Sequence, residues 1–205
     1  MNVVPGRPQA GARHSAQHEG IPVGRPAMHR IWQVGDDVNT DALAPGHSMQ
    51  HGVEVIARHC LEHHLPDFAT QVRAGDVLVA GRNFGIGSSR EQAAAVLVHL
   101  GLAAVVAPSY GGLFFRNAFN LGLVLLTCPQ AVQLQGVQEL AIDWPEHRLV
   151  LGDGRLLPCE PVPDFLLQMA RAGGLLASLK QRLQQARSGN PNLQARDPSA
   201  LADKF

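Results

Sequence analysis

The residue types with the clearest potential for chemistry follow a short apolar run at residues 77–80. A glycine-containing loop comes next, and two serines and an arginine then lead into a helical pattern: Gly85, Gly87, Ser88, Ser89 and Arg90. Glycines let a ligand approach the backbone closely. Unpaired N–H groups at a helix start and a guanidinium both attract anions. The stretch therefore predicts a site for a carboxylate or a phosphate.

The same residues also fit a purely structural role. Ser88 and Glu91 have the spacing of a capping box, in which a serine caps a helix and a glutamate reaches back to it. The stretch has neither the Gly-Lys-Ser/Thr ending of a P-loop nor the G-x-G-x-x-G spacing of a dinucleotide site. Spacing alone leaves both a helix cap and an anion site open.

The elements that must position these residues alternate between strands and helices. Strands are predicted at 29–34, 77–80, 103–107 and 123–126, with helices at 53–65, 88–100 and 113–120 and a tight polar loop at 35–41. Strands separated by helices indicate crossover connections and a mainly parallel sheet flanked by helices. Further strands at 140–143, 148–151 and 155–157 resemble a small β-hairpin around residues 152–154. The predicted fold class is α/β.

Composition divides the chain into three parts. Residues 1–28 are rich in Gly and Pro and are predicted to be a disordered N-terminal extension. Residues 29–172 are predicted to form one domain that ends in a helix at 165–172. Residues 173–205 are predicted to hold a C-terminal helix at 175–186 and then a disordered tail.

Charge and hydropathy exclude several classes of partner. Lys and Arg number 17, as do Asp and Glu, with no dense basic block, so nucleic acid is not expected. No apolar run reaches the ~18 to 20 residues that span a bilayer, and residues 1–27 lack the apolar core of a signal peptide. The three scattered cysteines, Cys60, Cys128 and Cys159, fit a reducing compartment, so we expect the cytoplasm.

Four segments, in order, resemble motifs of the mobile domain of the aconitase superfamily. Residues 35–41 (GDDVNTD) resemble its GDxxxTD loop, and residues 83–93 (NFGIGSSREQA) resemble its FGxGSSRE segment. Residues 104–107 (AVVA) are similar to the strand that follows, and residues 116–122 (RNAFNLG) to the RNAxNxGL segment. Four ordered motifs are far more specific than any one of them.

The resemblance implies a swivelling β/β/α domain that closes over a large subunit carrying a [4Fe–4S] cluster. The family reaction isomerises a 2-hydroxy di- or tricarboxylic acid by dehydration and rehydration. An iron of the cluster acts as Lewis acid on the leaving hydroxyl, and a serine of the small subunit removes the neighbouring proton. This chain would be that small subunit, active only with its partner and binding no cofactor or metal itself. A stand-alone carboxylate-binding regulatory module is the alternative from a different class.

The resemblance also assigns roles to individual residues. Ser88 matches the catalytic serine, and an alkoxide there would need nearby N–H groups and cations to stabilise it. Ser89 and Arg90 match residues that hold a substrate carboxylate, to which a guanidinium donates two parallel bonds. Thr40 and Asp41 match a loop at the same site, although a simple turn is an equal alternative.

Four further residues are possible substrate or interface residues. These are Gly85, Gly87, Arg116 and Asn117. The last two also fit the polar face of a helix that carries three phenylalanines, so a structural role is the alternative for them.

One stretch departs from the family pattern where the substrate's variable group is read. It holds His47, Ser48, Met49 and Gln50. Ser48 and Met49 replace a usual Tyr-Leu pair, and altered pocket chemistry shifts substrate preference. The acid could be 3-isopropylmalate, homoaconitate, 2,3-dimethylmalate or another alkylmalate.

The ten histidines invite a metal interpretation. His59 and His63 have the i, i+4 spacing of one helix face. No Glu-rich metal signature accompanies them, so we expect solvent-facing histidines and no metal site.

Overall fold

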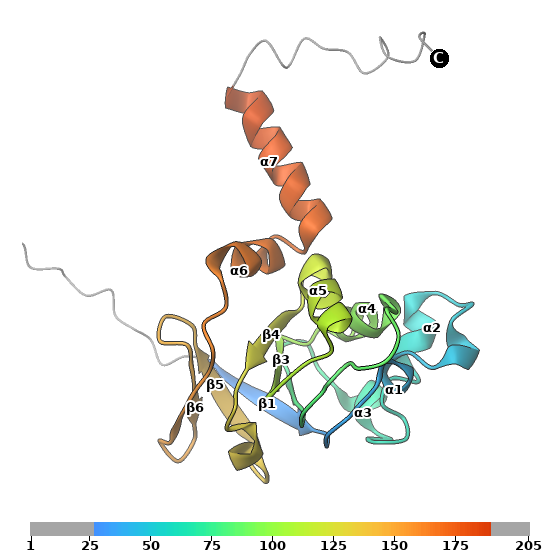
Figure 1. The fold of residues 1–205 in the computed structure, drawn as a ribbon, viewed down its shortest axis with the longest axis vertical. Helices are drawn as coiled ribbons and strands as arrows, with labels where there is room; N and C mark the ends of the chain where they lie inside the picture. The colour runs from blue at the N-terminus through green and yellow to red at the C-terminus, as the bar shows by residue number, and fades with distance from the viewer. Residues whose placement is uncertain (1–26, 190–205) are drawn as a thin grey trace, which may run out of the picture.

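The computed structural model describes residues 27–189, and its centre is a seven-stranded sheet (Figure 1). The strands are β1 (Met28–Gln33), β2 (Val77–Val79), β3 (Ala104–Ala107), β4 (Val124–Thr127), β5 (Glu139–Asp143), β6 (Arg148–Leu151) and β7 (Leu156–Pro158). They lie in the order β4-β3-β2-β1-β5-β6-β7. Residues 1–26 and 190–205, which hold most of the expected N-terminal extension and the tail, lie outside the described residues.

The sheet is partly parallel, and the α/β class is confirmed. Strands β1 to β4 run parallel, as expected for strands separated by helices. Strand β5 pairs antiparallel with β1, and β6 and β7 follow antiparallel. The expected hairpin is thus the β6–β7 pair, but it extends the main sheet instead of standing apart. Each step from β1 to β4 moves one strand in the same direction across the sheet.

Most helices are short. They are α1 (Thr40–Leu43), α2 (Val53–Ala57), α3 (Phe68–Gln71), α4 (Gln92–His99), α5 (Gly112–Leu121), α6 (Asp164–Arg171) and α7 (Leu175–Gly189), with 3-10 turns η1 (Gly46–Ser48) and η2 (Ala131–Leu134). The expected C-terminal helix is present as α7, which projects away from the sheet (Figure 1).

The helix expected over residues 53–65 ends early, at Ala57. Beyond it, Leu61 is fully buried and has a positive φ of 59°. Its N–H donates to the carbonyl of Ala42 in α1, 2.8 Å away, instead of continuing a helix. The contact with α1 outweighs the local helical pattern, because a buried leucine and a long-range hydrogen bond offset the cost of a left-handed residue.

The core reaches from the sheet into the loop after β2. Every residue of β2 and β3 is buried, as parallel strands covered on both faces require. Helix α4 contacts α1, α2 and α5. Phe84, in the loop, is fully buried against Phe114 of α5, with ring centroids 5.3 Å apart. The loop that carries Ser88 therefore rests on packed side chains.

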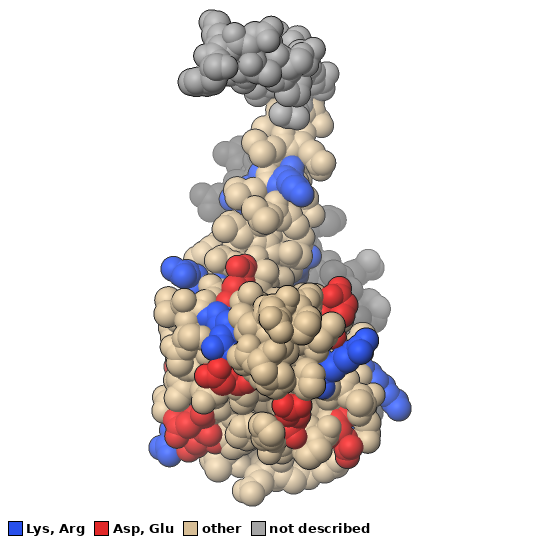
Figure 2. All heavy atoms as spheres, turned by 90° about the vertical axis from the view of Figure 1, so that its right-hand side faces the viewer, with Lys and Arg blue, Asp and Glu red and all other residues tan. Residues whose placement is uncertain are grey.

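The surface has a mixed charge pattern on the face that Figure 2 shows. Acidic and basic side chains are interspersed there among uncharged ones, and neither sign forms a continuous patch. Among the described residues, no helix is long and apolar enough to cross a membrane.

A buried carboxylate joins β1 to the turn before β2. Asp76 is 5% exposed, and its Oδ2 accepts hydrogen bonds from Arg30 Nη2 (2.6 Å), Trp32 Nε1 (2.9 Å) and Arg73 N (2.9 Å). Burial is the largest single influence and raises the pKa of Asp76, but the donors together outweigh it and hold that pKa below its ordinary value. The ionised group therefore stabilises the fold above the ordinary value of 3.8, and this stabilisation is lost as the pH falls through the lowered pKa.

We expect Asp76→Asn to lower the free energy of unfolding by about 2 to 4 kcal/mol at pH 7, because it removes the charge and leaves buried donors unpaired. Urea denaturation at pH 7 and at pH 3 measures the change, which should shrink at the lower pH. Asp153→Asn is the matched control, because Asp153 pairs with Arg155 on the exposed surface, and little change is expected. Equal effects of the two substitutions would contradict the assignment.

Candidate active site

Loops from the carboxyl ends of β1, β2 and β3 lie together and form the candidate site. They are residues 35–40, 81–88 and 108–111. Backbone hydrogen bonds join them, from Asp37 N–H to Arg82 O, Gly85 N–H to Val38 O, Thr40 N–H to Ile86 O and Phe84 N–H to Ser109 O. Ligands of open α/β sheets bind outside the carboxyl ends of parallel strands, and this is that edge of the sheet.

Ser88 lies exposed at this edge and is held by Thr40. The two hydroxyl oxygens are 3.0 Å apart, and the N–H of Ser88 donates to Thr40 Oγ1 over 3.1 Å. Thr40 is 1% exposed. Thr40 Oγ1 accepts the N–H and keeps its own hydroxyl hydrogen, so either hydroxyl can donate to the other. The contact with Thr40 holds the serine in place, and Thr40 can supply a donor to its oxygen.

The capping-box interpretation of Ser88 is wrong. Helix α4 begins at Gln92 instead of Ser88, its N-cap is Glu91, and no side chain caps it. The N–H of Ser88 instead donates to Thr40 Oγ1, which lies 48 residues earlier in the chain. Within the described chain, the N–H groups of Ser89 and Arg90 have no protein acceptor, so both remain available to a ligand.

Arg90 is oriented from one side and open on the other. Its Nη1 donates to Asp41 Oδ1 over 2.5 Å and to the carbonyl of Ala44 over 2.6 Å. The Arg90 side chain is 20% exposed, against 64% for Asp41. Among the described residues, Nε and Nη2 have no acceptor, so these two donors can bind a carboxylate in parallel.

Thr40 and Asp41 belong to a short helix and not to a simple turn. They are the first residues of α1, and the side chain of the N-cap Asn39 accepts a hydrogen bond from Ala42 N over 2.9 Å. The helix turns Thr40 inward to Ser88 and Asp41 outward to Arg90. The structure thus brings together both members of the predicted loop with Ser88 and Arg90.

The four possible substrate or interface residues differ in what surrounds them. Asn117 is 8% exposed, and its Nδ2 donates to the carbonyl of Ser89 over 3.1 Å, so it helps to hold the backbone of the site in place. Arg116 is exposed. Gly85 has φ 75°, and a Cβ there would lie 2.3 Å from Phe114 Cγ. Gly87 has φ 108°, and a Cβ there would lie 3.1 Å from Thr40 Oγ1.

The stretch expected to read the substrate's side group lies in and after η1. Ser48 is 2% exposed, and its Oγ donates to the carbonyl of Pro45 over 2.8 Å. Met49 packs against the core, whereas His47 and Gln50 are exposed. A hollow of about 360 Å³ is lined by Asp41, Pro45, Gly46 and His47 together with residues 62–64.

Sequence reasoning missed two contributions to this site. The first is Asn39, which the pattern of an Asn before a short helix could have suggested. The second is the carbonyl of Ala44, which orients Arg90. A backbone oxygen has no signal in the sequence, because every residue carries one.

The chain is similar to known proteins in both sequence and structure. The family model of the aconitase C-terminal domain matches residues 47–131. The 3-isopropylmalate dehydratase small subunit 1 of Archaeoglobus fulgidus is 40% identical over 162 residues, which cover 78% of this chain and 100% of that protein. The protein of the same name from Thermotoga maritima is 38% identical over 155 residues, covering 74% of this chain and 93% of that one. A crystal structure of 3-isopropylmalate dehydratase from Methanocaldococcus jannaschii superposes with a TM-score of 0.72 and 33% identity, over 80% of this chain and 98% of that chain.

The fold and the site thus define a C-terminal domain of the aconitase type. The chain belongs to the family of 3-isopropylmalate dehydratase small subunits, which are hydro-lyase subunits of the aconitase superfamily. The family expected from the four sequence motifs is therefore confirmed.

Proposed function

We propose that this chain pairs with a large dehydratase subunit and isomerises 3-isopropylmalate in leucine biosynthesis. The observation that carries the proposal is the open arrangement of Ser88 and Arg90. Ser88 is exposed, and Arg90 keeps two donors for a carboxylate. A substrate held there would face water on one side. A second protein must cover it for proton removal from carbon to proceed in a water-excluded space.

The chain's own residues would perform the binding and the proton transfer. Arg90 and the N–H groups of Ser89 and Arg90 hold one substrate carboxylate, while Asp41 keeps the guanidinium in place. With its own hydroxyl proton already lost to water while the site is open, Ser88 Oγ removes the proton from the carbon next to the departing hydroxyl. On rehydration it delivers a proton to the carbon that had carried that hydroxyl. Thr40 stabilises the negative charge on Ser88 Oγ by donating its hydroxyl hydrogen.

The cluster would belong to the partner. A [4Fe–4S] cluster bound there would supply the Lewis acid for the departing hydroxyl. This chain's cysteines do not fit such a ligand set, which needs several thiolates around one space, because the three cysteines form no such group among the described residues. Cys60 and Cys128 are buried, and burial raises the pKa of the Cys60 thiol well above its ordinary value. All three cysteines are unpaired, which supports a reducing compartment, and we propose the cytoplasm.

The stretch His47, Ser48, Met49 and Gln50 is proposed to set substrate preference. The support is that His47, alone of the four, lines the hollow that Asp41 also lines, next to the Arg90 carboxylate site. Ser48 would act on the shape of this stretch and not on the substrate directly, because its hydroxyl donates to the carbonyl of Pro45.

Reconstitution tests the proposed function. The full chain is mixed anaerobically with its cluster-loaded large subunit, and turnover is measured with 3-isopropylmalate, homoaconitate and 2,3-dimethylmalate. We expect neither chain to be active alone and the pair to prefer 3-isopropylmalate. Activity only with another acid would overturn the substrate, and inactivity with all three would overturn the enzyme. Tight dicarboxylate binding by the isolated chain, without reconstituted activity, would favour a regulatory module.

Thr40 is a positioning residue in this proposal. We expect Thr40→Val to lower kcat of the reconstituted pair about 10-fold, because one hydrogen bond to the developing charge is lost, and to leave KM almost unchanged. Thr40→Ser keeps the hydroxyl and should restore most of kcat. Steady-state kinetics of both variants measures this split. A threonine needed only for packing would show the opposite order, with the valine variant the more active.

A further inference from the structure

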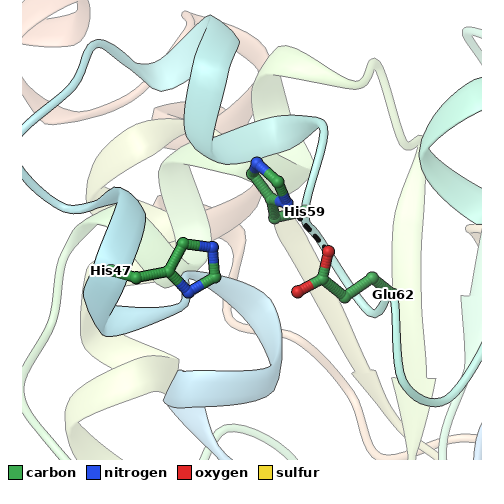
Figure 3. A group of neighbouring side chains, drawn as sticks. All are labelled: His47, His59 and Glu62. Atoms are coloured by element: carbon green, nitrogen blue, oxygen red, sulfur yellow. Dashed lines mark hydrogen bonds and ion pairs between the residues drawn. The ribbon is translucent and has the colours of Figure 1, made fainter.

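A second group of polar side chains lies beside η1, apart from Ser88 and Arg90. It consists of His47 in η1 and of His59 and Glu62 in the turn after α2. Figure 3 shows the two imidazole rings and the carboxylate pointing into one space. One nitrogen from each histidine and one oxygen from Glu62 all lie within 4.8 Å of one another.

The contacts within this group leave it open to a ligand. His59 Nδ1 lies 2.8 Å from Glu62 Oε2, and the rings of His47 and His59 meet edge to face with centroids 5.0 Å apart. The side chains of His59 and Glu62 are 38% and 31% exposed. Both side chains are therefore accessible to an ion from solution.

Hydrogen bonds hold the two backbone segments that carry this group, the turn at residues 58–64 and η1. Leu61 is buried between His59 and Glu62 in the chain, and its N–H is tied to Ala42 O of α1 at 2.8 Å. On the other side, the buried Ser48 hydroxyl donates to Pro45 O and fastens the turn that presents His47. The side chains can therefore converge on an ion without any movement of the backbone, which lowers the cost of binding.

We propose that His47, His59 and Glu62 bind one divalent transition-metal ion, with Zn²⁺ as the best fit. Two imidazole nitrogens, one carboxylate oxygen and an open fourth position are a common zinc ligand set. Ca²⁺ and Mg²⁺ prefer all-oxygen ligands and do not suit this group. Zinc needs its ligand atoms at about 2.0 to 2.2 Å, so the side chains must close in slightly, and their exposure allows that.

A bound ion would connect η1 to the turn at residues 58–64. Both segments line the hollow of about 360 Å³ that also contains Asp41, the partner of Arg90. The ion would therefore fix the wall beside the candidate carboxylate site. This consequence for substrate binding rests on the proposed function, whereas the metal binding does not.

Direct titration tests the site. The full chain, without a polyhistidine tag, is titrated with Co²⁺ followed by visible absorption and with Zn²⁺ followed by calorimetry. We expect one equivalent to bind with a dissociation constant of about 1 μM, by comparison with three-ligand sites. His47→Ala, His59→Ala and Glu62→Gln should each weaken that equivalent about 30-fold or more. His51→Ala is the matched control, because His51 is exposed close by in the chain but outside the group.

Thermal unfolding separates lost binding from lost folding. All three ligands are exposed or half-exposed, so each variant should keep the wild-type midpoint without metal. Excess Zn²⁺ should raise Tm by about 5 °C for the wild type and His51→Ala only. Three results would overturn the proposal. They are no metal binding at a metal concentration 100-fold above that dissociation constant, unchanged affinity in the three variants, or an equal loss of affinity in His51→Ala. Catalytic activity plays no part, so a failed reconstitution would leave this test intact.

Discussion

Ser88→Ala is expected to lower kcat of the reconstituted enzyme about 10³-fold, with KM changed little. The alanine removes the only group that the proposal places at the reacting proton, and general-base catalysis contributes about 10² to 10⁴ in rate. The rest of the carboxylate site stays in place, because Arg90 is held by Asp41 and Ala44 and not by the Ser88 hydroxyl. Single-turnover and steady-state kinetics with the cluster-loaded partner measure the loss.

The matched control for this substitution is Ser89→Ala. Ser89 is also exposed, but the structure uses its carbonyl, which accepts from Asn117, and the substitution keeps that contact. We expect it to raise KM modestly and to leave most of kcat. If Ser88→Ala kept more than a tenth of the wild-type kcat while the pair still assembled, Ser88 would not be the base.

Arg90→Lys is expected to raise KM about 10- to 100-fold. A lysine keeps the positive charge but offers no planar pair of donors, so one charge-assisted hydrogen bond to the carboxylate is lost. It also cannot reach Asp41 and Ala44 O while presenting two donors outward. The binding constant of a dicarboxylate inhibitor, measured with the reconstituted pair, should weaken by the same factor as KM.

Arg82→Lys provides the comparison for this effect. Arg82 lies in the same loop and pairs with Asp36 over 3.0 Å, but its side chain is 72% exposed. An exposed ion pair contributes little, so neither KM nor kcat should change by more than about 2-fold. Equal sensitivity of the two arginines would mean that the loop and not the Arg90 guanidinium was disturbed.

Local pattern predicted the strands well and the helices in part. Residues 29–34, 77–80, 103–107 and 123–126 correspond to β1 to β4 within about a residue, because short apolar runs between turn residues have few alternatives. The helix expected at residue 88 begins at Gln92. Its serines have a competing partner in Thr40, which lies far away in sequence and close in space.

Residue types and spacing indicated an anion site at residues 85–90, but only the family resemblance linked Thr40 and Asp41 to it. The site residues belong to two motifs, one with Thr40 and Asp41 and one with Ser88 and Arg90. More than a helix and a strand separates the two motifs in the chain, and neither motif indicates that they are neighbours in space. The histidine group was not visible at all. Helical spacing was noted only for His59 and His63, and no metal site was expected there. The helix stops at Ala57, and His47 becomes the neighbour of His59 instead.

The α/β class, the order of the strands along the chain and the family could all be predicted from the amino-acid sequence, because they depend on hydrophobic period and on motifs that are continuous in the chain. Which groups share a site depended on how the chain packs in three dimensions. The parallel strands β1 and β2 end at one edge, and that alone brings Thr40 to Ser88 and Asp41 to Arg90. The buried Leu61, tied to Ala42, likewise sets His59 and Glu62 opposite His47. Such contacts depend on long-range packing, whose energy no local spacing of residues contains.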